Sequence, residues 1–239
     1  MGSITRGLSN NITTGGVILP AGITNSSVSA VTSFSGVTGG GTLILLSTQT
    51  ASASATISFT TGLDSTYDEY IFKFIDIHPE TDQGRLEFQG STNGGSTYAT
   101  TITSTAFWAR HFEDDSTASL SYNTNHDIAQ GTTYQSITQG IGNEADESAS
   151  GSLTIFNPSS TTYVKHFIAT SSTYLYVPAE YNTYNAGYFN TTSAINAIQF
   201  RMTSGNIDDG VIKLYGVKKS WCRLINIFAM LMVLLNYME

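Results

Sequence analysis

Short runs of alternating apolar and polar residues recur along this chain from about residue 43 to residue 217, and clusters of Gly, Ser, Thr and Asn separate them. The clearest run is 196–203, in which every second side chain is apolar. A period of two is typical of a β-strand with one buried face. No helical apolar stripe of comparable length crosses this region. The pattern therefore predicts an all-β domain.

The runs predict many short strands with no helices between them, an arrangement typical of an antiparallel β-sandwich or jelly roll. We expect strands at 43–47, 55–60, 68–78, 86–89, 98–103, 106–113, 133–138, 152–156, 163–170, 187–190, 196–203 and 211–217.

Four further features of this region give specific expectations. The run 68–78 is apolar on both faces, which predicts a central strand covered on both sides. Asn93-Gly94 suits a type I′ turn, so 86–89 and 98–103 should form a hairpin. The acids and turn formers of 114–131 predict a long exposed loop. The tyrosine-bearing segment 173–184 interrupts the pattern, as a loop packed by its own rings or as a recognition surface.

The chain divides by composition into an N-terminal arm (1–41), the β-sandwich (42–219) and an apolar C-terminal tail (220–239). The arm is rich in Gly, Ser, Thr and Asn, so it is either an attachment segment or a disordered leader. Its candidate attachment residues are scattered aliphatics: Ile4, Leu8, Ile12, Val17, Ile18 and Leu19.

The tail is helix-prone, but its uninterrupted apolar run, Ile227–Leu235, has only nine residues. A transmembrane helix needs about 20. The alternatives are a membrane anchor, a packed helix at a subunit contact, or an appended segment without function. The abrupt change of composition after Lys219 favours the last, so a membrane partner is not expected.

Composition limits the classes of partner. Only 12% of the residues are charged, against about 25% in an average globular protein. The net charge is −8 and the domain lacks a cluster of Lys and Arg, so nucleic acid is not expected as a partner. The single cysteine, Cys222, excludes an intrachain disulfide, so stability must come from packing and oligomerisation. The first residues lack the apolar core of a secretory signal peptide, which fits a virion component released by lysis.

Motifs for catalysis are weak, and we expect a protein that is not an enzyme and has no cofactor. The histidines lack metal-ligand spacing, and neither a nucleophile elbow nor a P-loop occurs. The nominees for paired-carboxylate glycan hydrolysis are Glu113 with Asp115, or Glu144 with Asp146. Such acids can equally hold a structural calcium ion. The interpretation that we favour is that they are solvated loop residues.

Several blocks of the domain resemble structural proteins of marine tailed bacteriophages. These blocks are 45–68, Phe-Asn-Pro-Ser-Ser-Thr-Thr-Tyr-Val-Lys-His-Phe (156–167), Ala-Gly-Tyr-Phe-Asn-Thr-Thr-Ser-Ala-Ile (186–195) and 204–217. The resemblance implies a virion surface protein of the tail-fibre, spike or head-decoration type, and it transfers no catalytic residue. Separately, 91–98 is similar to the Asp-box turn of β proteins, with Asn93 in place of Asp, which predicts a structural turn.

We expect a tail fibre or spike subunit that contacts host-surface glycan, because sugar faces stack on aromatic rings. The candidate glycan-binding residues are Trp108, His111, Tyr174, Tyr176, Tyr181 and Tyr184. The competing interpretation is that these rings fill the core or a subunit interface, and Trp108 is core if Phe107 and Ala109 face outward. A homotrimer bound to other virion proteins is expected. The alternatives are a capsid decoration protein with a purely architectural role and a glycan depolymerase.

Overall fold

The structure is a computed structural model that describes residues 12–13, 16–17 and 43–218. The chain separates into two units, Met1–Gly40 and Gly41–Glu239. In the first unit, β1 (Ile12–Thr13) pairs antiparallel with β2 (Gly16–Val17), with Ile12 opposite Val17. The other expected attachment residues (Ile4, Leu8, Ile18 and Leu19) and the tail 220–239 lie outside the described residues.

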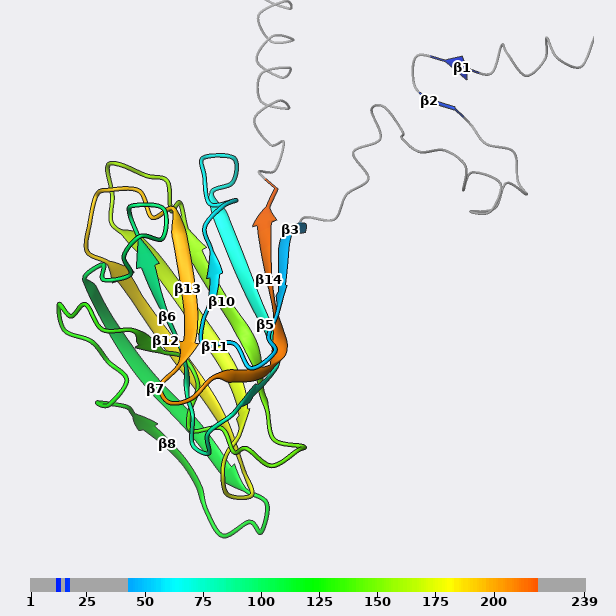
Figure 1. The fold of residues 1–239 in the computed structure, drawn as a ribbon, viewed down its shortest axis with the longest axis vertical. Coiled ribbons are helices and arrows are strands. Elements are labelled where there is room, and N and C mark those ends of the chain that lie inside the picture. Colours follow the sequence, from blue (N-terminus) through cyan, green and yellow to red (C-terminus); the bar gives the residue numbers. More distant parts are fainter. Residues whose placement is uncertain (1–11, 14–15, 18–42, 219–239) are drawn as a thin grey trace, which may run out of the picture. The chain divides into compact units, whose positions relative to one another are not determined.

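The second unit consists of two antiparallel sheets packed face to face, which confirms the predicted β-sandwich (Figure 1). The large sheet has eight strands in the order β3 (Leu43–Thr50), β14 (Ile207–Val217), β5 (Glu69–Pro79), β10 (Ala149–Phe156), β11 (Lys165–Tyr174), β12 (Ala179–Phe189), β7 (Ile102–Phe112) and β8 (Ala118–Tyr122). The small sheet has four strands in the order β4 (Ile57–Phe59), β13 (Ala197–Met202), β6 (Leu86–Ser91) and β9 (Gln135–Ser136).

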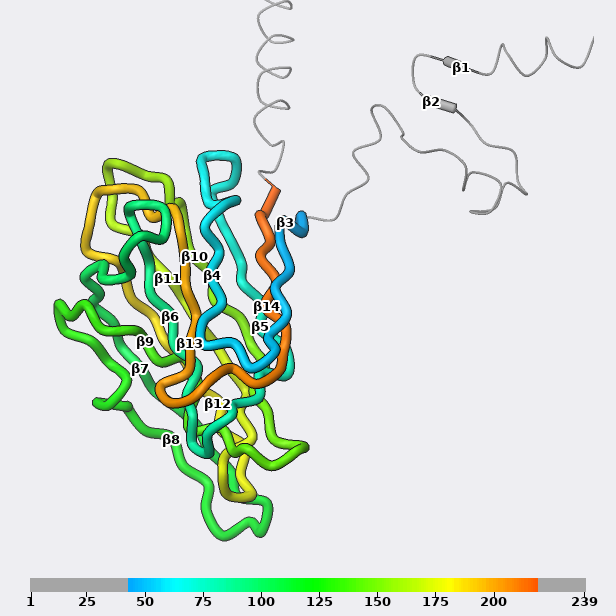
Figure 2. The backbone as a smooth tube through the Cα atoms, viewed as in Figure 1, coloured from blue at the N-terminus to red at the C-terminus, as the bar shows by residue number. Residues whose placement is uncertain are grey.

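The chain passes repeatedly between the two sheets, as the tube in Figure 2 shows. The first and last strands of this unit are neighbours at one edge of the large sheet. There β3 pairs antiparallel with β14, so that Leu43 lies opposite Val217. No helix within the described residues has the length and hydropathy that crossing a membrane requires.

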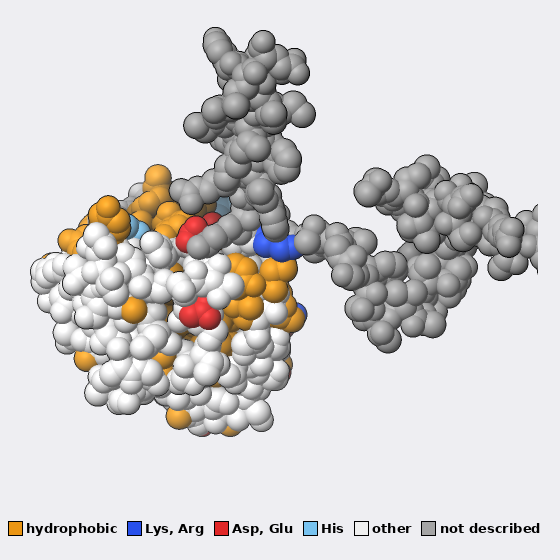
Figure 3. Space-filling view, turned by 90° about the horizontal axis from the view of Figure 1, so that it is seen from above, with side chains coloured by type: hydrophobic (Ala, Val, Ile, Leu, Met, Phe, Trp, Pro, Cys, Tyr) orange, Lys and Arg blue, Asp and Glu red, His pale blue; other side chains and the backbone are white. Residues whose placement is uncertain are grey.

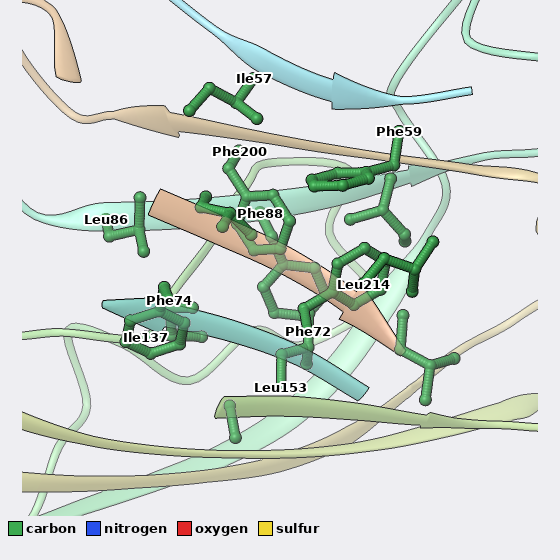
Figure 4. Packing of buried hydrophobic residues seen from close by; sticks show 14 of the residues in the cluster. Ile57, Phe59, Phe72, Phe74, Leu86, Phe88, Ile137, Leu153, Phe200 and Leu214 are labelled. Atoms are coloured by element: carbon green, nitrogen blue, oxygen red, sulfur yellow. The ribbon is translucent and has the colours of Figure 1, made fainter. Parts of the chain in front are cut away.

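Aromatic rings from both sheets meet in the core (Figure 4). Phe72 of the large sheet lies 5.2 Å from Phe59 and 5.4 Å from Phe200 of the small sheet, measured between ring centroids. Phe88 contacts Phe167 edge-on at 5.1 Å. Such edge-to-face pairs contribute about 0.5–1.5 kcal/mol each beyond the burial of their area. The predicted alternation of 196–203 is confirmed, since Ile198, Phe200 and Met202 are buried here.

The small sheet covers only part of the inner face of the large sheet. The segment 123–142 also lies against this face, through the buried side chains of Ile137 and Ile141 and through several polar contacts. Ser171 Oγ donates to the carbonyl oxygen of Ile137 at 2.7 Å, and Ser104 Oγ donates to Gln135 Oε1 at 2.5 Å. Gln135 Nε2 in turn donates to the carbonyl oxygen of His126 at 2.7 Å. The prediction that 114–131 is an exposed loop is therefore wrong, because it contains β8 and the buried His126.

The predicted hairpin around Asn93 is also wrong, because β6 and β7 lie in different sheets. The segment is instead a crossover whose turn is braced by the Asn93 side chain. Asn93 Oδ1 accepts hydrogen bonds from Ser91 Oγ at 2.8 Å and from the backbone N–H of Thr97 at 3.0 Å. Gly94 and Gly95 follow with φ values of 71° and 88°. The expectation of a structural turn is thus confirmed, although the strands that it connects differ.

Two further expectations fail in the large sheet. The segment 173–184 does not interrupt the strands, because β11 and β12 run through it and are joined by the short turn 175–178.

In β5 only one face is covered. Phe72 and Phe74 point into the core, whereas Ile75 on the opposite face is 37% exposed. A positive φ at Asp76 marks the bulge where the alternation of β5 shifts. The outer face of the large sheet is therefore open to solvent within the described chain.

Candidate binding face

The candidate site is the outer face of the large sheet, which carries most of the large apolar side chains that remain exposed. Strand alternation produces it: along β7, Trp108 points inward while its neighbours Phe107 and Ala109 point outward. Large exposed side chains on this face are Leu43, Leu45, Ile75, Phe107, Leu120, Tyr122, Phe156, Ile168 and Tyr184. An exposed apolar patch of this kind is typical of an interaction surface.

A stacked pair of aromatic rings, which we call the platform, lies near one edge of this face. Phe107 and Tyr184 are directly opposite each other on β7 and β12, and their rings stack with centroids 4.9 Å apart and planes 12° apart. Phe107 is 44% exposed and Tyr184 is 40% exposed. Tyr122 pairs with Phe107 on the other side. Its hydroxyl donates to Asp127 Oδ2 at 2.7 Å, and this hydrogen bond raises the pKa of Tyr122.

A shallow hollow, which we call the apolar hollow, adjoins the platform and has a volume of about 480 Å³. Its outward-facing lining comprises Thr103, Thr105, Phe156, His166, Ile168, Ala186 and Tyr188. The hollow exists because the small side chain of Ala186 lies between larger lining residues, Ile168 and Tyr188. Behind it, Gly187 faces inward, where a Cβ would approach Phe167 Cζ to 2.7 Å. Glycine at 187 therefore lets the core ring pack close beneath the floor.

The six aromatic and histidine side chains predicted to bind glycan do not form one site. His111, Tyr174 and Tyr184 lie on outward-facing positions of the large sheet. Tyr176 lies in the turn 175–178 and is exposed. Trp108 and Tyr181 lie on the inner face, on neighbouring strands.

Trp108 and Tyr181 surround the side chain of Arg110 beyond the small sheet. The guanidinium carbon of Arg110 lies 5.2 Å from the Trp108 ring centroid and 5.9 Å from that of Tyr181. Arg110 Nη1 donates to the Tyr181 hydroxyl at 2.9 Å, and Nε donates to Ser119 Oγ at 3.0 Å. Tyr181 is only 7% exposed. These two rings therefore serve internal packing, as the competing interpretation of the sequence holds.

The nominated carboxylates lie on loops. Glu113 and Asp115 are in the β7–β8 turn, where Asp115 Oδ1 lies 2.9 Å from His111 Nε2, with both side chains exposed. Glu144 and Asp146 lie in the loop before β10, where the backbone N–H of Glu144 donates to Glu147 Oε2 at 2.8 Å. Within the described residues, no group of three or more His, Cys, Asp and Glu side chains is arranged to hold a metal ion.

The loop before β10 does border a hollow of about 600 Å³. The lining of this hollow includes Asp76, His78, Asp146, Asp208 and Asp209. His78 is held between two partners there. Its Nε2 lies 3.1 Å from the carbonyl oxygen of Glu144, and its Nδ1 lies 3.6 Å from Asp208 Oδ2. Nothing in this geometry favours calcium over solvation of the acids.

Sequence reasoning missed Phe107, Phe156, Ile168 and Tyr188, the apolar residues that surround Ala186 on the outer face. A signal for Phe107 was present, because an inward Trp108 requires an outward Phe107. No sequence signal shows which face of a strand the second sheet will cover.

Comparisons of the chain with protein-family models, with curated proteins and with solved structures find no match.

Proposed function

We propose that this protein is a non-catalytic surface protein of a tailed-bacteriophage virion, a tail fibre or spike subunit that contacts host-surface glycan through the outer face of its large sheet. The observation that carries the proposal is the stacked pair Phe107–Tyr184 beside the apolar hollow. The edges and the outer faces of the two stacked rings present apolar surface to the C–H face of a sugar. The hydroxyls of Thr103 and Thr105 and the imidazole of His166 supply polar partners at its border.

The rest of the molecule fits this assignment. Few charges, many hydroxyl and amide side chains and a net charge of −8 suit binding to uncharged polar ligands better than binding to phosphate backbones. The passage of the chain between the sheets also suits the jelly-roll arrangement, which we keep as part of the proposal. The bacteriophage assignment rests on the sequence blocks that resemble virion proteins. A homotrimer joined to other virion proteins through the 1–41 arm belongs to the same proposal.

A capsid decoration protein is the second candidate, and one observation favours it. β8 forms an outer edge of the large sheet, and its Leu120 is 71% exposed. An exposed apolar edge strand is a ready site for pairing with a neighbouring subunit. The depolymerase alternative is not carried forward, because none of its nominated carboxylates lines the apolar hollow.

The deciding experiment is binding of the purified full chain to a glycan array that carries neutral and acidic oligosaccharides and bacterial polysaccharides. We expect selective binding, and we expect the double variant Phe107→Ala/Tyr184→Ala to lose at least tenfold in affinity. The control is Leu45→Ala, which also shortens an exposed side chain but lies on β3 at the far edge of the same sheet. A folded wild-type chain that binds no glycan on the array would overturn the proposal. Equal losses in the double variant and the control would do the same.

A further inference from the structure

A second hollow lies at one end of the sandwich and differs chemically from the first. Its volume is about 280 Å³, and it is lined by Thr92, Thr97, Ala99, Thr100, Thr101, Asn190 and Thr191. Hydroxyl groups and one amide therefore dominate its lining, in contrast to the rings and aliphatic groups of the apolar hollow. We call it the threonine hollow.

The two hollows are neighbours where β7 begins and β12 ends, and they are lined there by residues two positions apart. Thr103 and Tyr188 line the apolar hollow, and Thr101 and Asn190, two residues further along the same two chain segments, line the threonine hollow. Residues two apart on an extended chain face the same side, about 7 Å from each other. The extended pairing persists to this point, because the backbone N–H of Asn190 donates to the carbonyl oxygen of Thr101 at 2.7 Å.

The side chain of Gln130 fixes the junction between the hollows. Gln130 Nε2 donates to Thr103 Oγ1 at 2.5 Å, and Gln130 Oε1 accepts from Asn190 Nδ2 at 2.6 Å. One amide thus holds a residue of each hollow in place. On the far side, Thr97 Oγ1 accepts from Asn93 Nδ2 at 3.0 Å, which leaves the hydroxyl hydrogen of Thr97 free to donate elsewhere. The polar groups are therefore oriented before any ligand binds.

The charge of the lining limits the ligand class. Among the described residues that line the two hollows there is no Asp, Glu, Lys or Arg. The nearest buried cation, Lys165, lies behind the threonine hollow, with its ammonium donating to the carbonyl oxygen of Thr191 at 3.1 Å and no exposed surface. Figure 3, which views the domain from above, shows a mostly uncharged surface on which hydrophobic side chains occur in more than one area and charged ones are few. Among these described lining residues, no Lys or Arg is present to pair with an acidic sugar, and His166 is the one imidazole.

We propose that the apolar hollow and the threonine hollow together form one groove for a neutral oligosaccharide of at least two sugar units. The apolar face of one sugar lies over Ala186, between Ile168 and Tyr188. The hydroxyls of the next sugar bond to Thr101, Thr97 and Asn190. This inference rests on the proposed function, and it adds the charge, the minimum length and the binding direction of the ligand.

The test is isothermal titration of the full chain with neutral oligosaccharides of one to four units, in glucose, galactose and N-acetylglucosamine series, with oligogalacturonate as the acidic comparator. We expect a gain of at least tenfold in affinity from one unit to two in the preferred neutral series. Thr101→Val removes a hydroxyl at constant shape, and it should abolish that gain while leaving single-sugar affinity within twofold. Ala186→Phe fills the apolar hollow and should weaken every length.

Two controls keep the outcomes distinct. Thr48→Val makes the same chemical change on β3, at the opposite edge of the sheet, and should leave affinity unchanged. Thermal melting of each variant checks its fold. A length gain that survives in Thr101→Val, or tighter binding of the acidic series, overturns the groove. If glycan binding is lost in Phe107→Ala/Tyr184→Ala but untouched in Ala186→Phe, the groove fails and the proposed function stands. If the wild type binds no sugar, the proposed function itself fails.

Discussion

Arg201 and Glu87 form a cross-strand ion pair on the small sheet, with Arg201 Nε 2.6 Å from Glu87 Oε1. The carboxylate is only 6% exposed, and the guanidinium carbon of Arg201 also lies 3.8 Å from the centroid of the Tyr134 ring. The arginine therefore satisfies a nearly buried acid and covers an aromatic ring at once.

Substitution of Arg201 should destabilise the domain more than a typical surface substitution does. Arg201→Met leaves the Glu87 carboxylate without its cation, and breaking a buried pair costs about 3–5 kcal/mol. Because the Arg201 side chain is 45% exposed, water screens much of that loss, and we expect about 1–2 kcal/mol. Urea unfolding measures it. The double variant with Glu87→Gln should recover part of the loss, and strict additivity of the two changes would contradict coupling between the residues.

The outer face should contribute little to folding even though it is aromatic. Phe107→Ala removes a ring that is already 44% exposed, so we expect a loss of under about 1 kcal/mol. Phe88→Ala, which removes a ring of the same size from the core, should cost about 3–5 kcal/mol. Chemical denaturation of both variants makes the comparison. Similar losses would show that Phe107 belongs to the structural core rather than to a binding surface.

Ala186 and Gly187 are adjacent in sequence, but a larger side chain should destabilise the domain only at position 187. Gly187→Ala places a Cβ 2.6 Å from the carbonyl oxygen of Thr103 and 2.7 Å from Phe167 Cζ, so overpacking should cost about 1–3 kcal/mol. Ala186→Ser adds one atom on the outward face and should be nearly neutral. Melting temperatures of the two variants give the answer, and the prediction fails if Gly187→Ala is as stable as wild type.

His126 should make the domain acid-sensitive. Burial, and then the charge of Arg85, lower the pKa of His126 from 6.5 to about 4. Between these values the unfolded chain binds a proton that the folded chain excludes. The contribution of His126 to stability is therefore complete above pH 6.5, and it falls by about 1.4 kcal/mol per pH unit as the pH drops towards 4.

Urea unfolding at several pH values in this window measures the slope. His126→Gln cannot be protonated and should flatten it, whereas His111→Gln, at an exposed histidine, should not. An unchanged slope in His126→Gln would assign the acid sensitivity to other groups.

The sequence predicts strands well where one face is buried and the other is not. Ile198, Phe200 and Met202 alternate with polar side chains, so β13 was found nearly to its ends. The middle of β12 was missed for the opposite reason. Its inward residues Thr183 and Asn185 are buried but polar, because they face the part of the domain that segment 123–142 covers. Because the inward set is polar here and the rings stand in the outward set, the alternation gives no signal of a buried apolar face.

The candidate site was harder to predict than the fold. Tyr184 was identified, but Phe107, its stacking partner, comes from a strand 77 positions away and is adjacent only through the register of β7 with β12. The Asn93 turn shows the same limit. The sequence predicts a structural turn there, but it does not predict that the turn joins strands of different sheets. Local patterns specify strands and turns, whereas the covered face of a sheet depends on how distant segments pair.

The antiparallel pairing of Leu43 with Val217 also decides how the sandwich would respond to load. A force that pulled these two residues apart would act on the end of the β3–β14 ladder. It would break the hydrogen bonds between the two strands one after another. Because β3 is the edge strand and bonds only to β14 in this sheet, the β3–β14 ladder carries such a load before any other part of the large sheet does.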